Sequence, residues 1–456
     1  MNSICNLHKK IDNFNFKDKR LNSRLSTLCT QLETDGESSI SSMFSNQGQL
    51  KGYYRFINNP KVKSSMLIDI FGTFSLEEVQ DESVILALQD TTELDYTGKR
   101  SASNVGCMEY LHRRGLYLHN HLLINPLGIP LGLFSQRFIQ RSDESLGKSK
   151  QRISLPIEEK ESYRWLAEFN LLQDKFATQT DKTVIDICDR EADISELLSA
   201  RRYSHIHYIV RSRSERKTTT SGVSIWEEVA AQKSTFSYQQ EVSDAKGKKR
   251  IANLFVRYCP VILSPTYRKG KKLLPQPVYL VETKEENPPK GCKPICWRLL
   301  TSLKVEDDLT AKKIIDYYVL RWIIERFHHI LKQGRKVENL QIEGVEALKN
   351  AIVLQSWIAL KVATLAYQAR FTPDLPLEKK EDFTTEDYNM LAKYVKNKYD
   401  KNVQLKEQPT WGDFTKLIAQ IGGSSLQKNR PLGVPSLWKG FRKYLLIKET
   451  YILFKE

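Results

Sequence analysis

The sequence predicts an α/β protein with helical regions at both ends of the chain. Short apolar runs rich in β-branched residues recur, bounded by turn residues, and are typical of buried strands. A helical pattern separates two of these runs. Helical periodicity also dominates the first 65 residues and most of the chain after residue 311. With 456 residues, the chain is long enough for two to four structural units, each with its own core.

The composition supports a folded protein that binds a polyanion. Hydrophobic residues make up 40% of the chain and aromatic residues 10%, which excludes wholesale disorder. The 70 Lys and Arg residues exceed the 54 Asp and Glu residues, so the formal net charge is +16. Such an excess of basic residues most often indicates nucleic acid, because each cation placed on a phosphate releases a counterion.

Cysteine usage and apolar segments predict a cytoplasmic protein without a membrane span. The seven cysteines are odd in number and thinly spread, which argues against a secreted disulfide framework. Cys292 and Cys296 have three residues between them, where a zinc site prefers two, and they lack the second pair expected of such a site. The N-terminal decapeptide has no apolar core of a signal peptide. Residues 351–367, interrupted by Gln355 and Lys361, read as a buried helix.

The elements are expected in the following order. Residues 1–65 are helical and carry a basic cluster for which phosphate binding and a solvated helix face remain equally open: Lys17, Lys19, Arg20 and Arg24. The central part contains five strands and one helix: strands 83–89, 117–124, 131–139, 183–188 and 206–210, and a helix over 157–175. Residues 212–303 read as a β-rich insertion with two basic runs, 246–250 and 268–272.

The C-terminal third is predicted to be helical. A long helix begins at Ala311, and a second covers about 343–370. Residues 371–376 contain two prolines and read as a linker. The remainder of the chain again shows helical periodicity.

Two aspartates are expected at the ends of buried strands. Asp90 follows the strand over 83–89, and Asp189 follows the strand over 183–188. Ligands gather at strand ends in open α/β sheets, and Mg²⁺ and Mn²⁺ prefer carboxylate oxygens. Two such ions about 3.5–4 Å apart can activate a water and stabilise a leaving oxygen in phosphoryl transfer. For either residue alone, a structural cap or a solubilising loop residue is the favoured interpretation, and it is the pair together with a third acid that favours a metal site.

A third acid is predicted from helical geometry. At about 100° per residue, four residues with polar groups share one face within roughly 60°: Tyr318, Arg321, Glu325 and Lys332. Apolar residues occupy another face and would pack on the core: Val319, Ile323, Phe327 and Ile330. A solvated salt-bridge face is the alternative. If the face is instead functional, Glu325 would complete the metal site. Arg321 and Lys332 would then hold DNA phosphates, and Tyr318 would donate to a phosphate oxygen.

The pattern Y-x₂-R-x₃-E-x₆-K formed by these four residues resembles the YREK signature of bacterial insertion-sequence transposases with a DDE catalytic triad. The sequence resembles in particular the branch containing the cut-and-paste transposase of the composite kanamycin-resistance transposon. Six further segments match in the family order, which makes the resemblance specific: 52–60, 89–92, 188–194, 210–212, 287–291 and 297–301. The resemblance covers about 50–340.

The resemblance implies a ribonuclease-H-like mixed sheet with flanking helices and the β-rich insertion at 212–303. It divides the chain into a helical DNA-binding domain (1–65), a catalytic domain (66–370) and a helical dimerisation domain (376–456). By carry-over, Asp90, Asp189 and Glu325 would form the catalytic triad. These three would bind two Mg²⁺ ions per active site, with Mn²⁺ as a substitute.

The resemblance also implies that a base near the transferred DNA end flips out and stacks on an indole. Trp297 stands in the matching place, with core packing as its alternative role. Arg211 and Tyr318 match residues that hold the backbone of the flipped nucleotide. Trp322 matches a residue lining the same pocket, and a core role is as plausible for it. The early paired tryptophans of the family are absent here, where Leu116 and Tyr117 stand.

The implied mechanism is nicking by an activated water, hairpin formation by the freed 3′-hydroxyl, hairpin opening, and joining to target DNA. The implied partners are double-stranded DNA, both inverted-repeat ends and target, and a second copy in a homodimer acting near the bacterial nucleoid. Two alternatives remain: a ribonuclease-H-fold nuclease without strand transfer, and a catalytically silent DNA-binding protein derived from a transposase.

Overall fold

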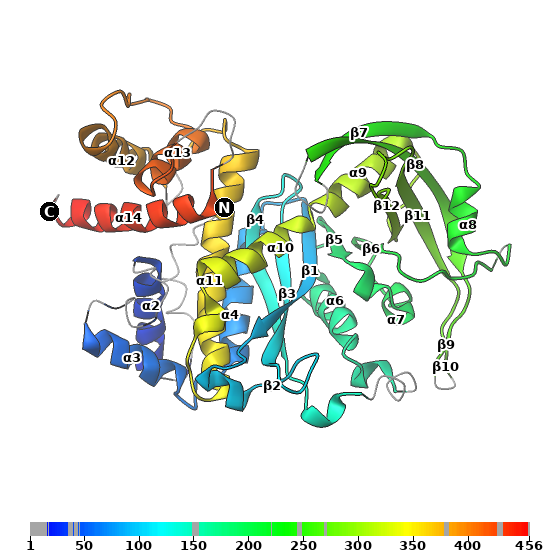
Figure 1. The fold of residues 1–456 in the computed structure, drawn as a ribbon, viewed down its shortest axis with the longest axis horizontal. Helices are drawn as coiled ribbons and strands as arrows, with labels where there is room; N and C mark the ends of the chain where they lie inside the picture. The colour runs from blue at the N-terminus through cyan, green and yellow to red at the C-terminus, as the bar shows by residue number, and fades with distance from the viewer. Residues whose placement is uncertain are drawn as a thin grey trace. The chain divides into compact units, whose positions relative to one another are not determined.

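The computed structural model describes residues 16, 18–34, 40, 44, 46–147, 155–219, 221–243, 249–268, 271–377, 383–425 and 432–454 (Figure 1). Lys17 of the predicted basic cluster, and residues 246–248 and 269–270 of the two basic runs, lie outside them. The described residues form two compact units. Unit 1 draws on 1–82, 91–146 and 323–456, and unit 2 on 83–90 and 147–322. The three-domain division expected from the sequence stays a prediction.

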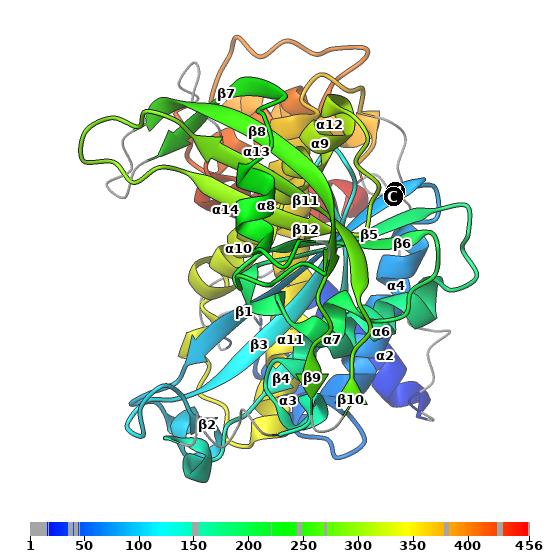
Figure 2. The ribbon, with the colours of Figure 1, turned by 90° about the vertical axis from the view of Figure 1, so that its right-hand side faces the viewer.

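Unit 2 is built around a mixed sheet. Its strand order is β1-β5-β6-β12-β11-β8-β7. The strands are β1 (Val84–Asp95), β5 (Thr183–Cys188), β6 (Ile206–Arg211), β12 (Cys296–Thr301), β11 (Gln276–Glu285), β8 (Lys249–Leu263) and β7 (Phe236–Ser243). The first three are parallel and the rest pair antiparallel. Figure 2 shows β8, β11 and β12 side by side. The β-rich character predicted for 212–303 is confirmed.

Helices and a short hairpin complete unit 2. They are α6 (Tyr163–Phe176), α7 (Ser195–Leu198), α8 (Ile225–Ala230), α9 (Asp308–Val319) and the hairpin of β9 (Tyr267–Arg268) with β10 (Lys271–Lys272). A capping box between Ser224 and Glu227 fixes the start of α8, which packs on β8 and β11. The predicted strand over 183–188 and the predicted helix over 157–175 are both confirmed, apart from a later helix start.

Unit 1 contains an antiparallel hairpin covered by two helices. The hairpin consists of β3 (Arg114–Ile124) and β4 (Pro130–Ile139), and β2 (Gly106–Cys107) pairs with β3. Helices α4 (Ser64–Glu78) and α11 (Val345–Phe371) pack on β4 and run alongside each other (Figure 1). Gly72 permits the close approach of α4, because a Cβ there would lie 2.5 Å from the Phe134 carbonyl oxygen. The buried helix predicted over about 343–370 is α11.

The remaining helices of unit 1 come from both ends of the chain. They are α2 (Lys19–Thr34), α3 (Gln47–Ile57), α12 (Thr385–Lys398), α13 (Trp411–Ile421) and α14 (Val434–Leu453). Capping boxes that begin at Thr384 and Thr410 start α12 and α13. Where the structure describes them, both terminal regions are therefore largely helical, as predicted. Within the described ranges, no helix is both long and apolar enough to span a membrane.

Strand β1 contributes to both units, through Val84–Asp90 in one and Thr91–Asp95 in the other. Read through this shared strand, the order is β4-β3-β1-β5-β6. The hairpin is antiparallel and β1, β5 and β6 are parallel. This is the predicted ribonuclease-H-like sheet.

Two predictions about local structure were wrong. Asp90 does not end its strand, because the β-branched Thr91 and Thr92 extend β1 to Asp95. The helix predicted from Ala311 begins at Asp308 and is not continuous. A turn at Leu320 and Arg321 separates α9 from α10 (Trp322–His329), since the Arg321 amide donates to the Tyr318 carbonyl three residues back. A π-helical turn (Ile330–Gly334) follows α10. An angle of 100° per residue therefore does not give the position of Lys332 around the helix.

Candidate active site

Register places Asp90 and Asp189 side by side on neighbouring strands. Pairing of β1 with β5 runs from Val84 opposite Thr183 to Leu88 opposite Ile187, a constant offset of 183 − 84 = 99 residues. Asp90 and Asp189 are also 189 − 90 = 99 residues apart. The backbone at Asp189 is still extended. Because side chains alternate along strands about 4.8 Å apart, both carboxylates lie on one face of the sheet.

The same row continues onto β6 and β12. Val184 is opposite Ile206 and Cys188 is opposite Val210, an offset of 22 residues that carries Asp189 to Arg211. Arg211 is in turn paired with Leu299 of β12. Trp297 lies two residues before Leu299 and therefore on the same face, beyond the end of β6. One face of unit 2 thus presents two carboxylates, a guanidinium and an indole across four strands.

The opposite face of β1 and β5 is a buried polar layer. Gln89 is fully buried, and its Nε2 donates to Asp186 Oδ2 at 2.7 Å. The Cys188 thiol also donates to Asp186 Oδ2, at 3.5 Å. Burial, reinforced by Asp186, raises the pKa of Cys188, so its thiol stays neutral. These contacts fix the residues immediately preceding Asp90 and Asp189, and so hold the two strands in register beneath the row.

Arg321 connects this row to a group of aromatic side chains. Its Nη1 lies 3.5 Å from Asp90 Oδ2, and only 10% of its side chain is exposed. Its guanidinium carbon is 5.9 Å from the Tyr318 ring centroid and 6.0 Å from that of Trp322, within the range of cation–π attraction. The Tyr318 and Trp297 rings meet edge to face at 5.9 Å. We call Trp297, Tyr318, Arg321 and Trp322 the aromatic cluster.

Two of the four residues of the predicted helix face, Tyr318 and Arg321, are not solvated. Tyr318 and Arg321 are buried, which contradicts a surface salt-bridge face at their positions. Burial raises the pKa of the Tyr318 phenol, against the opposing effect of Arg321 and Arg211, so it is a neutral hydrogen-bond donor. Trp322 is 57% exposed, which excludes the core role left open for it.

Asp189 also serves as a cap. Its Oδ1 accepts from the Glu191 amide at 2.7 Å and starts the 3₁₀ turn Arg190–Ala192. Among the described residues, no hydrogen bond or ion pair involves its Oδ2. The cap bond therefore fixes the side chain through one carboxylate oxygen. The cap and the ligand interpretations raised by the sequence are compatible.

The donor set suits a divalent cation in part. Paired carboxylate oxygens are the ligands that Mg²⁺ and Mn²⁺ prefer, and the row supplies two of them. In the part of the chain that the structure describes, no three acidic, imidazole or thiol side chains gather closely enough to hold a metal ion. Asp90 and Asp189 are thus the two residues of the predicted triad that the sheet brings together.

Glu325, the third predicted acid, lies on α10 in unit 1, where it is half-buried. A buried hydrogen-bond network attaches this helix to the hairpin. The His328 imidazole is 2.9 Å from Asn120 Nδ2 of β3, and Gln136 of β4 donates to Asn120 Oδ1 and to Ser356 of α11. Since His328 is one turn from Glu325, the network fixes the helix that carries Glu325 within unit 1. No sequence motif indicated these residues.

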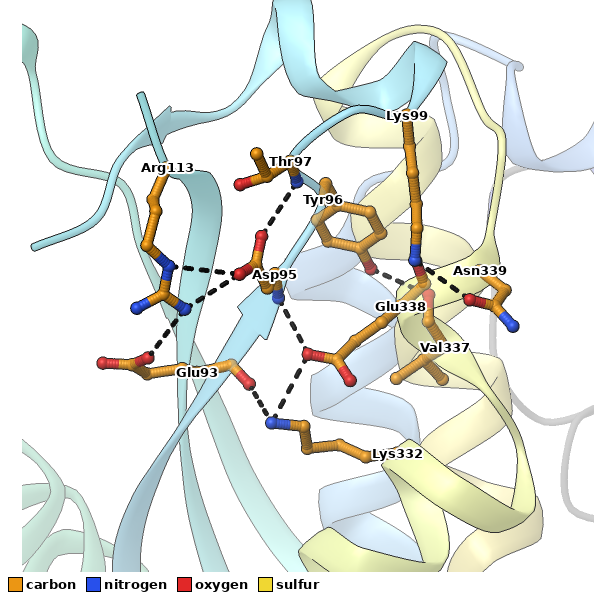
Figure 3. Close-up of polar contacts among 10 residues, drawn as sticks. All are labelled: Glu93, Asp95, Tyr96, Thr97, Lys99, Arg113, Lys332, Val337, Glu338 and Asn339. Carbon is orange, nitrogen blue, oxygen red and sulfur yellow. Dashed lines mark hydrogen bonds and ion pairs between the residues drawn. The ribbon is translucent and has the colours of Figure 1, made fainter. Parts of the chain in front are cut away.

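Lys332 lies in the π-helical turn of unit 1 and is held by protein partners (Figure 3). Its Nζ donates to the Glu93 carbonyl at 2.8 Å and lies 3.4 Å from Glu338 Oε1. Nearby, the Arg113 guanidinium pairs with Asp95 at 2.8 Å. Desolvation opposes ionisation of Asp95, but hydrogen bonds from Thr97 and Arg113 prevail and lower its pKa to about 2. The surroundings of Lys332 are therefore densely charged at neutral pH.

Asp193 is another residue to which the sequence assigned no role. Its side chain is fully buried, and its Oδ2 accepts from the backbone amides of Arg213 and Ser214 at 2.6 and 2.8 Å. It also pairs with Arg216. These bonds hold the loop that follows Arg211, next to the carboxylate row. The only signal in the sequence was its place in the segment 188–194.

Comparisons with known proteins match two parts of the chain. Residues 7–62 match the family described as transposase DNA-binding, and residues 169–360 match the family described as transposase DDE domain. The second match includes Asp189, the aromatic cluster, Glu325 and Lys332. A solved structure with partial likeness is the piggyBac transposase synaptic complex with hairpin DNA. It is 10% identical, with a TM-score of 0.35, and the match covers 86% of this chain and 77% of that chain.

Proposed function

From the premise that this chain has the domain composition of a DDE transposase, we propose that it moves its DNA element by cut-and-paste transposition. It would bind the inverted-repeat ends of the element, cut them and join the 3′ ends to target DNA. A homodimer would pair two ends in the bacterial cytoplasm. The observation that carries the proposal is the row of Asp90, Asp189 and Arg211 across one sheet face, with Trp297 beyond it.

In this proposal, Asp90, Asp189 and Glu325 are the catalytic carboxylates that hold Mg²⁺ or Mn²⁺, two ions per site. When bound there, divalent cations would activate the attacking water and stabilise the leaving 3′ oxygen. Asp189 is suited to this role because its cap bond fixes the carboxylate through one oxygen. Arg321 Nη1 is 3.5 Å from Asp90 Oδ2. When divalent cations bind Asp90, the Arg321 guanidinium can leave that carboxylate and bind a DNA phosphate with two hydrogen bonds.

The aromatic cluster explains why the proposal is transposition and not simple hydrolysis. A nuclease needs only the carboxylates. The half-buried Trp297 meets the buried Tyr318, and Arg321 lies near both Tyr318 and the exposed Trp322. All four residues belong to the same unit as Asp90 and Asp189. A flipped base can stack on an indole face, and Arg211 and Tyr318 can hold its phosphate. Such a binding site for a flipped base supports a hairpin intermediate. In that step the freed 3′-hydroxyl attacks the opposite strand and displaces the flanking DNA of that strand.

The direct test uses the DNA that flanks the reading frame. A duplex that carries one of the inverted repeats is incubated with the protein and either Mg²⁺ or EDTA. We expect a nick at the 3′ end of the repeat, then a hairpin, then joined products when target DNA is added, all in Mg²⁺ alone. Cleavage without joined products would instead support a nuclease. Binding without cleavage would support the silent DNA-binding protein.

Helix α3 provides a prediction about end binding. It buries Tyr53, Phe56 and Ile57 and exposes Lys51, Tyr54 and Arg55 on the opposite face, with no acidic residue. The double variant K51A/R55A is expected to bind transposon ends more weakly and to lower the slope of log K against log salt by about 2, because each phosphate contact contributes about 0.9. Filter binding at several salt concentrations measures the slope. Lys63→Ala, an exposed lysine at the start of α4, serves as the control. An unchanged slope would show that α3 does not contact DNA phosphates.

A further inference from the structure

A short segment behind Lys332 is tied to the end of β1 by several polar contacts. The 3₁₀ turn η7 (Val337–Asn339) meets the residues that end and follow β1 (Figure 3). The Asp95 amide donates to Glu338 Oε1 at 2.9 Å, and the Tyr96 hydroxyl donates to the Val337 carbonyl at 3.0 Å. The Lys99 ammonium donates to the Glu338 carbonyl and to Asn339 Oδ1. All these residues belong to unit 1.

Glu338 is the centre of this arrangement. Its Oε1 accepts the Asp95 amide and also lies 3.4 Å from Lys332 Nζ. The chain can return to Lys332 within six residues because Lys336 adopts a left-handed conformation, with φ of 48°. One carboxylate oxygen therefore joins the backbone of β1 to the ammonium.

Lys332 keeps capacity for another ligand. An ammonium has three donor hydrogens, and its partners among the described residues are the Glu93 carbonyl and Glu338. About a quarter of its side chain, 27%, is exposed. A flexible lysine loses considerable rotamer freedom when it binds a phosphate, and a lysine that is already held loses less.

We propose that Glu338 is the positioning residue for Lys332, and that it holds the ammonium at the end of β1, ready for a DNA phosphate. This inference rests on the proposed transposase function, in which Lys332 binds DNA. Glu338 does not itself touch DNA. Its carboxylate acts through Lys332, and its bond to the Asp95 amide holds that carboxylate in place.

The first experiment measures the position of Lys332 without any DNA. The folded full-length chain is treated with an amine-acylating reagent, and mass spectrometry follows modification of Lys332 over time. Glu338→Ala is expected to raise the acylation rate of Lys332 several-fold. The control Glu343→Ala, which removes an exposed carboxylate from the same stretch of chain, should leave the rate unchanged. Equal rates in the wild type and Glu338→Ala, with both proteins folded by circular dichroism, would overturn the proposal.

The second experiment measures coupling in end nicking. Lys332→Ala is expected to slow nicking by about 10–100-fold, the effect of one charge-assisted hydrogen bond in the transition state. Glu338→Ala should approach that loss, and the double variant should be no slower than Lys332→Ala alone. Glu338→Gln keeps an acceptor for the Asp95 amide and should recover most of the rate. Losses that multiply in the double variant would overturn the proposal.

The two experiments separate this inference from the function on which it rests. If the wild type cuts no DNA, the proposed function fails, while the acylation rates still decide whether Glu338 positions Lys332. If Lys332→Ala nicks at the wild-type rate, the role of Lys332 in DNA chemistry is wrong, and with it the purpose assigned to Glu338.

Discussion

Asp189→Asn is expected to slow the nicking of transposon ends in Mg²⁺ by at least about 10³-fold, equivalent to about 4 kcal/mol of lost transition-state stabilisation. The reason is that an amide oxygen is a poor ligand for a divalent cation beside Asp90. The substitution keeps the fold, because the Asn carbonyl can still accept the Glu191 amide and Asn caps helices as well as Asp does. End binding is expected to stay within about twofold, since most affinity comes from phosphate contacts. Single-turnover cleavage of a labelled end measures the rate.

A matched control lies two residues away. Glu191 is an acid of the same turn, but its carboxylate is half exposed and pairs with Arg164. Glu191→Gln should therefore nick at close to the wild-type rate. Asp90→Asn and Glu325→Gln should behave like Asp189→Asn, although Glu325 stands in the other compact unit. Nicking by Asp189→Asn within tenfold of the wild type would show that the row on β1 and β5 is not the catalytic site.

The strands that carry this row were predictable because each contains a short run of apolar and β-branched residues, which by itself favours a buried strand. Residues 183–188 contain four β-branched residues, and β5 spans the predicted residues. The interval of 99 residues between the two aspartates was visible in the sequence. Its meaning was not, because only strand pairing shows that the same interval is the register of β1 with β5. The cap formed by Asp189 was among the possibilities that the sequence left open.

The helical part of the site was predicted less well, for a physical reason. A helical wheel assumes one regular helix, and the turn at Arg321 and the π-helical turn at 330–334 both change the angle between residues. Burial of Ile323, Phe327 and Ile330 was still correct, because each lies near the regular part of α10. The contact of Arg321 with Asp90 joins residues 231 positions apart, and no local pattern encodes it. Glu338 carries no signal for the same reason.

Trp297→Ala is expected to impair hairpin formation by about 5–150-fold, the effect of losing about 1–3 kcal/mol of base stacking. First-strand nicking should change by much less, because the aspartate row does not depend on the indole. The Tyr318 ring, which meets Trp297 edge to face, remains in the variant and limits the cavity that loss of the indole leaves. Gel analysis of nicked and hairpin products from the same reaction gives both rates.

Two further variants show whether the effect belongs to stacking. Trp297→Phe keeps an aromatic face and should restore much of the hairpin rate. Trp226→Ala removes the tryptophan of α8, which stacks with Arg298 of β12 in the same unit, and should slow the two steps equally if at all. A base that flips must leave its own stack at a cost of a few kcal/mol, so the protein has to supply a replacement surface at that step. Equal loss of nicking and hairpin formation in Trp297→Ala would mean that the indole supports the sheet and does not receive a base.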